Sequence, residues 1–137
     1  GVFFNFHTRI EETFHYFLVI IFFPHVNSIS ANLLTPMVEN YLESNEKPNR
    51  LKIKEIKKIP LTLSDVNTDA LRFIKGNNLR LRASPSINSE IYDELILGQV
   101  VTVLSKQKNW IEVMYEYEDG ESISGWVFTR YTEKFIK

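Results

Sequence analysis

Two histidines and two glutamates near the start of the chain invite interpretation as a metal site. His7, Glu11 and His15 lie four residues apart, so a helix would place them on one face, with Glu12 beside them. They lack the zinc-peptidase arrangement, in which two histidines four residues apart accompany an intervening glutamate. Histidines that face solvent or are satisfied within the fold explain the same pattern, and we therefore predict no metal and no other cofactor.

Catalytic chemistry has little support elsewhere in the sequence. The chain has no cysteine, which excludes disulfides, thiolate catalysis and cysteine-ligated zinc. Acidic residues crowd one stretch, but no pair of them has a feature that would raise a carboxyl pKa for acid–base work: Glu112, Glu116, Glu118, Asp119 and Glu121. The net charge of −1 argues against a nucleic-acid partner. We predict that the chain is not an enzyme.

Aromatic side chains in the C-terminal half are better candidates for function. Trp110 and Trp126 fall on the parity opposite to their apolar neighbours in the sequence, and a small β-domain has too little interior to enclose every ring. Exposed rings can stack on a peptide or a sugar. We predict ligand-binding roles for Trp126, Tyr92, Tyr131 and Trp110. For Trp110 a structural role, covering one end of the domain, is favoured; for the other three, binding and packing both stay open.

Strand and turn signals from residue 70 onward must position these rings. Leu79–Arg82 alternates apolar and basic residues, and Pro85 ends that strand. Residues 105–109 form a polar turn, after which Trp110 starts a long alternation. Its predicted core face carries Ile111, Val113, Tyr115 and Tyr117, and its other face carries Trp110, Glu112, Met114, Glu116 and Glu118. Asp119-Gly120 closes the hairpin.

Ordered motifs in this half resemble the bacterial SH3 (SH3b) family, from about Leu71 to Ile136. The matching positions are Leu79, Leu81, Arg82, Pro85 and Ser86, then Leu95, Gly98 and Trp110, and finally Gly125, Trp126, Val127 and Tyr131. Arg80 and Ser84 depart from the family, which usually has Asn and Gly there. The resemblance implies a mainly β fold, a small SH3-like barrel with a short helical N-terminal extension, and a cell-wall peptide or a protein as ligand.

The N-terminal segment, residues 1–30, contains a ten-residue apolar run at Phe14–Phe23. This length is too short to span a bilayer and matches the core of an export signal, with small residues following at Ser28–Ala31. Glu11 and Glu12 ahead of the run weaken that interpretation, and a buried amphipathic helix remains the alternative. If the segment is an export signal, the protein is periplasmic, secreted or in the cell envelope, and otherwise it is cytoplasmic. Membrane contact is expected only through this segment, if it is retained.

Residues 31–69 are expected to form a helical, charged linker before the barrel domain of residues 70–137. Thr35 as cap and Pro36 at the first helical position predict a short helix, which ends at residues 44–49. Residues 51–59 suit either a strand or a helix. The basic residues among them are expected to form a solvated face, although an anionic membrane or a polyanionic cell-wall polymer would also attract them: Arg50, Lys52, Lys54, Lys57 and Lys58.

These observations predict a non-catalytic binding or targeting module that recognises a cell-wall peptide or a protein partner. The alternative is an accessory domain of an enzyme whose catalytic part lies outside this chain. A shared fold does not by itself decide between them.

Overall fold

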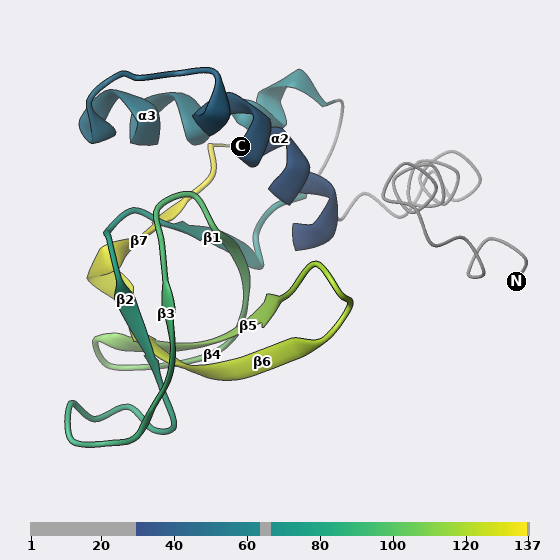
Figure 1. Cartoon of the computed structure of the whole chain (residues 1–137). Coiled ribbons are helices and arrows are strands. Elements are labelled where there is room, and N and C mark those ends of the chain that lie inside the picture. Colours follow the sequence, from purple (N-terminus) through teal and green to yellow (C-terminus); the bar gives the residue numbers. More distant parts are fainter. Residues whose placement is uncertain (1–29, 64–66, 137) are drawn as a thin grey trace, which may run out of the picture.

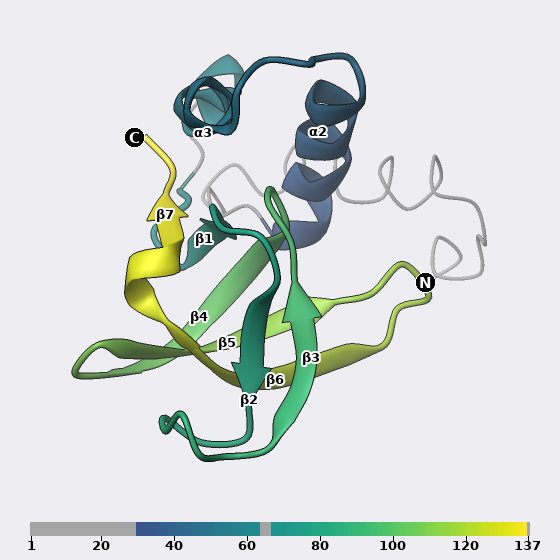
Figure 2. The same cartoon turned by 60° about the vertical axis from the view of Figure 1, so that its left-hand side comes forward.

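The computed structural model describes residues 30–63 and 67–136, and consists of one curled antiparallel sheet with helices across one end (Figures 1 and 2). The strands are β1 (Leu71–Ile74), β2 (Leu79–Arg82), β3 (Ile91–Leu95), β4 (Val100–Gln107), β5 (Trp110–Glu116), β6 (Ser122–Phe128) and β7 (Thr132–Lys134). Their order across the sheet is β3-β2-β6-β5-β4-β1-β7. The prediction of a mainly β, SH3-like barrel with a helical N-terminal extension is confirmed.

The helical layer consists of α2 (Ala31–Glu43), α3 (Asn49–Ile56) and the 3-10 turn η2 (Ile59–Thr62). A second 3-10 turn, η3 (Thr129–Tyr131), joins β6 to β7. Of the two structures left open for residues 51–59, a helix followed by a 3-10 turn is the one observed.

The predicted start of the first helix is wrong by five residues. The helix begins at Ala31 after Ser30, and Pro36 lies inside it rather than at its first position. Thr35 does not cap the helix, because its hydroxyl donates a hydrogen bond back to the Ala31 carbonyl, 2.8 Å away. The earlier start buries Ala31 and Leu34 against the barrel, and this burial offsets the backbone hydrogen bond that proline cannot make.

The alternation predicted from Trp110 is confirmed in β5. Ile111, Val113 and Tyr115 are buried, whereas the residues between them are half-buried. The turn before β5 is shorter than predicted: β4 continues to Gln107, which pairs with Trp110, so only Lys108 and Asn109 form the turn. The Asp119-Gly120 hairpin is confirmed, with Gly120 at a φ of 90°.

The alternation predicted for β2 holds for Leu79, Arg80 and Leu81 but fails at Arg82, which is only 8% exposed. The register between β2 and β3 shifts between Leu81 and Arg82. The Arg82 guanidinium lies over the following loop, where it donates a hydrogen bond to the Ser89 carbonyl at 3.0 Å.

Two apolar clusters hold the described residues together. The barrel cluster lies inside the curled sheet and consists of Ile74, Leu79, Leu81, Leu95, Val101, Ile111, Val113, Tyr115 and Val127. The interlayer cluster lies between the helices and the sheet and consists of Ala31, Leu34, Val38, Ile56, Leu71, Phe73, Val100 and Phe135. The helices of residues 31–63 are therefore packed on the barrel.

Gly98 allows α2 to approach the barrel closely. Its φ of 90° is a conformation that residues with a side chain rarely adopt. A Cβ atom there would also lie 2.5 Å from Leu42 Cδ1 and 3.2 Å from Val38 Cγ1, both on α2. Gly98, one of the positions that resemble the SH3b family, thus also leaves room for the side chains of α2.

Several predictions fall on residues that the structure does not describe. These are the export signal or buried helix at Phe14–Phe23 and the metal-site pattern at His7, Glu11 and His15. The division into segments 1–30, 31–69 and 70–137 also stays a prediction.

Candidate binding surface

The outer faces of β5 and β6 carry a pair of stacked rings. Trp110 and Phe128 are direct cross-strand partners, so both side chains lie on the same face of the sheet. Their ring centroids are 4.0 Å apart and their planes differ by 26°. The neighbours on the opposite parity, Ile111 and Val127, belong to the barrel cluster. Strand alternation therefore places this stack outside the barrel.

The turn η3 adds a third ring and a cation to the stack. Tyr131 meets Phe128 edge to face, with centroids 6.1 Å apart and planes at 81°. The Arg130 guanidinium lies 5.5 Å from the centroid of Phe128 and 4.7 Å from that of Tyr131, and it donates a 2.6 Å hydrogen bond to the Tyr131 hydroxyl. We call the set Trp110, Phe128, Arg130 and Tyr131 the aromatic surface.

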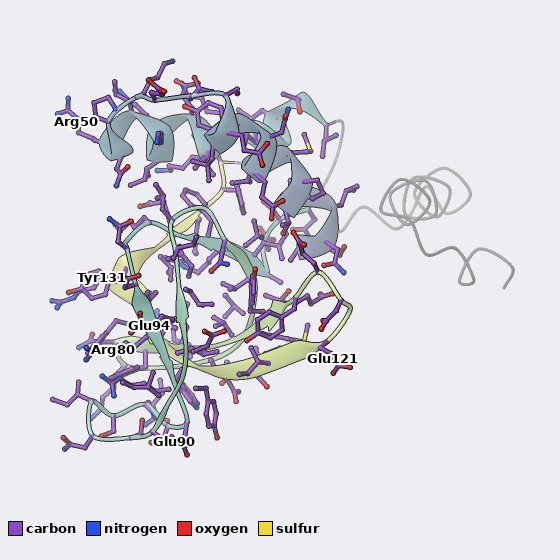
Figure 3. The ribbon with its side chains drawn as sticks, viewed as in Figure 1. Arg50, Arg80, Glu90, Glu94, Glu121 and Tyr131 are labelled. Carbon is purple, nitrogen blue, oxygen red and sulfur yellow. The ribbon has the colours of Figure 1, made fainter. Side chains whose placement is uncertain are left out.

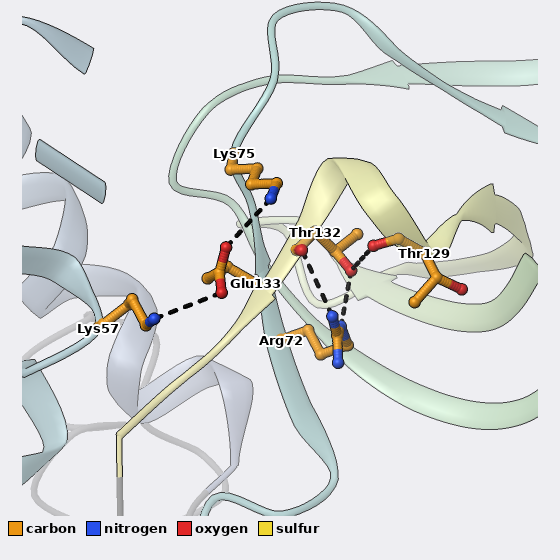
Figure 4. Close-up of polar contacts among 6 residues, drawn as sticks. All are labelled: Lys57, Arg72, Lys75, Thr129, Thr132 and Glu133. Atoms are coloured by element: carbon orange, nitrogen blue, oxygen red, sulfur yellow. Dashed lines mark hydrogen bonds and ion pairs between the residues drawn. The ribbon is translucent and has the colours of Figure 1, made fainter. Parts of the chain in front are cut away.

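Hydrogen bonds from β1 hold η3 in place (Figure 4). Arg72 Nε donates to Thr132 Oγ1 at 2.6 Å, and the same threonine hydroxyl donates to the Thr129 carbonyl at 2.8 Å. Burial lowers the pKa of Arg72, although the nearby Glu133 acts in the opposite direction. The position of Tyr131, near the C-terminal end of the chain, thus depends on Arg72 of β1, the first strand of the barrel.

The ends of β1 and β7 carry a second polar group. Glu133 accepts a hydrogen bond from Lys75 Nζ at 3.2 Å and pairs with Lys57 Nζ at 3.4 Å. Burial tends to raise the pKa of Glu133, but the hydrogen bonds and charges of these two lysines outweigh it and keep that pKa below its usual value. This group joins α3 to the edge of the sheet.

The predicted site residues occupy two regions. Trp110 and Tyr131 belong to the aromatic surface. Trp126 is half-buried on the same face of β6, where it pairs with Glu112 of β5 and Arg82 of β2. Tyr92 is 48% exposed on β3. Among residues 30–63 and 67–136, no ring contact joins Trp126 or Tyr92 to Tyr131. The ligand-binding roles of all four residues stay predictions.

Gly125 explains how Trp126 keeps its outward position. A Cβ atom at Gly125 would lie 2.6 Å from the Arg82 carbonyl oxygen and 3.0 Å from Leu81 Cγ. Only glycine lets β2 and β6 approach this closely, and Leu81 fills the barrel at this position. The Trp126 ring is consequently not a member of the barrel cluster.

Sequence reasoning missed Phe128 and Arg130. Phe128 follows Trp126 by two residues on one strand, so alternation alone places both on one face. The hairpin turn at Asp119-Gly120 also fixes the register that pairs Phe128 with Trp110. Arg130 has no such periodic signal, because it lies in a 3-10 turn.

Two tyrosines near the other end of β5 are structural. Tyr115 is buried in the barrel cluster, Tyr117 packs partly against it, and their rings meet edge to face at 5.2 Å. The Tyr117 hydroxyl donates a 2.5 Å hydrogen bond to Asp93 Oδ2, which raises the pKa of Tyr117 to about 12. Burial is the main cause of the raised pKa of Tyr115. These findings confirm the prediction that both tyrosines pack with Val113.

The part of the chain that the structure describes contains no group of three or more histidine, aspartate or glutamate side chains able to hold a metal ion. Neither of its two α-helices has the length and apolar character needed to cross a membrane.

Comparison with known protein families gives one match, the bacterial SH3 domain, over residues 77–133. No curated protein and no solved structure matched the chain. The matched range begins just before β2 and ends within β7, so it includes the aromatic surface, Trp126 and Tyr92, and excludes both helices. Residues 77–133 thus match the bacterial SH3 domain, a non-catalytic family of binding domains.

Proposed function

We propose that this chain is a non-catalytic targeting module that binds an extended cell-wall peptide on its aromatic surface. The observation that carries the proposal is the continuous contact from Trp110 through Phe128 to Tyr131, with Arg130 over the last two rings. These rings sit on paired strands and a hydrogen-bonded turn, so little conformational entropy remains to be lost when a ligand binds.

The chemistry of the surface fits a peptide. Three rings offer apolar faces and edges to side chains or to peptide planes. Arg130 uses one nitrogen for its bond to Tyr131, and its remaining N–H groups can donate to carbonyl or carboxylate oxygens of a ligand. Each ring contact contributes on the order of 1 kcal/mol, so affinity depends on several rings acting together.

Trp126 and Tyr92 would extend this surface across the sheet. Trp126 precedes Phe128 by two residues on the same face of β6, which is about 7 Å along a strand. Through Arg82, its partner on β2, the same row continues to Ile91 on β3, which is exposed and directly precedes the exposed Tyr92. An extended ligand that crosses the strands from η3 would reach Trp126 and then Ile91, next to Tyr92.

The test is a set of alanine variants titrated with soluble peptidoglycan fragments by calorimetry. Phe128→Ala and Tyr131→Ala should each weaken binding about fivefold, because each removes one ring contact. Leu104→Ala is the matched control, because Leu104 is 50% exposed on β4 and makes no ring contact. Folded Phe128 and Tyr131 variants that bind as tightly as the control would overturn the proposal.

The proposal includes export to the cell envelope, with cleavage near Ser30-Ala31. Cleavage before Ala31 would leave all of α2 in the mature chain, with Leu34 and Val38 in the interlayer cluster. Intact mass of the native protein is the test. A mature chain that starts near Ala31 supports export, and a cytosolic chain that retains Phe14–Phe23 contradicts it.

A further inference from the structure

A basic face on α3 lies outside the matched SH3 range. Residues 47–58 contain six basic side chains and one acidic side chain. Arg50, Lys54 and Lys57 follow one another at helical spacing, so they line one side of α3. With Leu51, Ile53 and Glu133 they surround an open hollow of about 430 Å³ between α3 and β7. Glu133, the acidic member, is already matched by Lys57 and Lys75 (Figure 4).

Three side chains of this face, Arg50, Leu51 and Lys54, have no structural role in the described part of the fold. Neither Arg50 nor Lys54 has a hydrogen-bond or ion-pair partner among residues 30–63 and 67–136, and both are exposed. Leu51 is 38% exposed and does not belong to the residues that pack on the interlayer cluster. An apolar side chain thus stands among cations that are available to a partner. Leu61, 53% exposed on η2, adds a second apolar side chain close by in the sequence.

Charge is separated across the molecule. Residues 109–121, which comprise β5 and the hairpin tip, carry five acidic side chains and no basic one. Both ribbon views place that hairpin far from α3, and Arg50 and Glu121 lie at opposite sides in the view with side chains (Figures 1, 2 and 3). The α3 side of this molecule can therefore approach an anionic surface while the acidic hairpin stays away from it.

We propose that α3 docks the protein on an anionic lipid surface, with Arg50 and Lys54 at the headgroups and Leu51 inserted between them. Lys57 and Lys58, which pair with Glu133 and Glu55, lie beside them and neutralise the acidic side chains of this face. Paired basic and apolar side chains are what an anionic bilayer selects, because it offers a charged layer above an apolar one. A soluble polyanion would use the cations alone and would gain nothing from Leu51. This membrane role uses a different surface from the proposed peptide binding, so either can fail without the other.

The experiment measures partition of the full chain onto phosphatidylglycerol-containing vesicles and onto pure phosphatidylcholine vesicles. Any affinity that comes from Phe14–Phe23 is common to all variants and is present on both vesicle types. Arg50→Gln/Lys54→Gln should lower partition onto the anionic vesicles about 30-fold, because each cation near such a surface contributes about a fivefold factor. Leu51→Gln should lower it about fivefold through lost apolar insertion.

The matched control is Arg80→Gln/Lys106→Gln, which removes two exposed charges from β2 and β4 and should change partition by less than about threefold. Inorganic polyphosphate serves as the soluble polyanion. Equal losses in the two double variants, or equal partition of the unmodified chain onto both vesicle types, would overturn the proposal. It is also overturned if Leu51→Gln has no effect and polyphosphate binds as tightly as the anionic vesicles, since the face would then recognise a soluble polyanion.

Discussion

The barrel cluster and the interlayer cluster are both apolar and buried, but the chain assembles them differently. The barrel cluster is built from strand residues between Ile74 and Val127, within the sequence of a single small domain. The interlayer cluster joins residues as distant as Ala31 and Phe135. A barrel of this kind can thus be recognised from one stretch of sequence, whereas the layer that covers it depends on contacts between segments far apart.

The two clusters meet where adjacent residues point to opposite sides of the sheet. Phe73 and Val100 belong to the interlayer cluster, and their neighbours Ile74 and Val101 belong to the barrel cluster. β1 and the start of β4 are therefore buried on both faces. A sheet with only one covered face would leave Phe73 and Val100 in contact with water. The helices thus complete the fold at this end of the barrel.

Removal of the helices should have the largest effect on stability. A fragment of residues 70–137 exposes Leu71, Phe73, Val100 and Phe135, which are all at most 5% exposed in the full chain. We expect the fragment to keep the barrel but to lose about 4 kcal/mol or more of unfolding free energy. Urea unfolding together with amide exchange measures both. If the fragment were as stable as the full chain, the helices would contribute nothing to the stability of the barrel. If β4 and β5 had no protected amides, the barrel would be unable to fold alone.

Phe73→Ala should be the most damaging single substitution in the interlayer cluster. Phe73 is fully buried, and its ring centroid lies 5.1 Å from that of Phe135. We expect a loss of about 3–5 kcal/mol through lost transfer energy and a residual cavity. Leu61→Ala is the control, because Leu61 is 53% exposed and should lose under about 0.5 kcal/mol. Comparable losses in the two variants would contradict the assignment of Phe73 to a core.

Val113→Ala tests the barrel cluster in the same way. Val113 is fully buried, so we expect its truncation to lower the free energy of unfolding by about 1–3 kcal/mol. Truncation of its half-buried neighbour Met114 to alanine should lower it by less. Chemical denaturation of the two variants measures the difference. If Met114→Ala proved the more damaging change, the parity of β5 would be inverted.

The hydrogen bond from Tyr117 to Asp93 gives a smaller, pH-dependent effect. Tyr117 has a pKa of about 12 in the folded chain, against about 10 in an unfolded one. The stability that this bond contributes is thus complete below about pH 10 and is lost as pH rises toward 12. Ultraviolet titration of tyrosine ionisation measures the pKa, and Asp93→Asn should lower it. Titration of Tyr117 near pH 10 in the unmodified folded chain would contradict this account.

Sequence periodicity predicted the parts of the barrel that have one wet face. β5 and its hairpin follow from strict alternation and the Asp119-Gly120 turn, and the core positions Ile111 and Val113 came from the same pattern. Alternation failed where a tertiary contact outweighed a local signal. The register shift at Arg82 and the helix start at Ala31 are both of this kind, because each is set by neighbours from elsewhere in the chain.

The aromatic surface was only partly predictable for the same reason. Trp110 and Tyr131 were identified as rings in excess of what the core can enclose. Phe128 contacts both of them, but its position could be predicted only by extending the β5–β6 pairing beyond Trp126. Arg130 required the geometry of η3, which depends on hydrogen bonds from Arg72 through Thr132. The sequence alone shows no sign of that connection.

Amide chemical-shift mapping during titration with soluble peptidoglycan peptides tests the proposed binding role most directly. The largest shifts should cluster at Trp110 and at residues 128–131, continue toward Trp126, and disappear in Tyr131→Ala. Absence of shifts at saturating peptide, or shifts confined to α3 or to the acidic hairpin, would contradict the claim that the aromatic surface is the binding site.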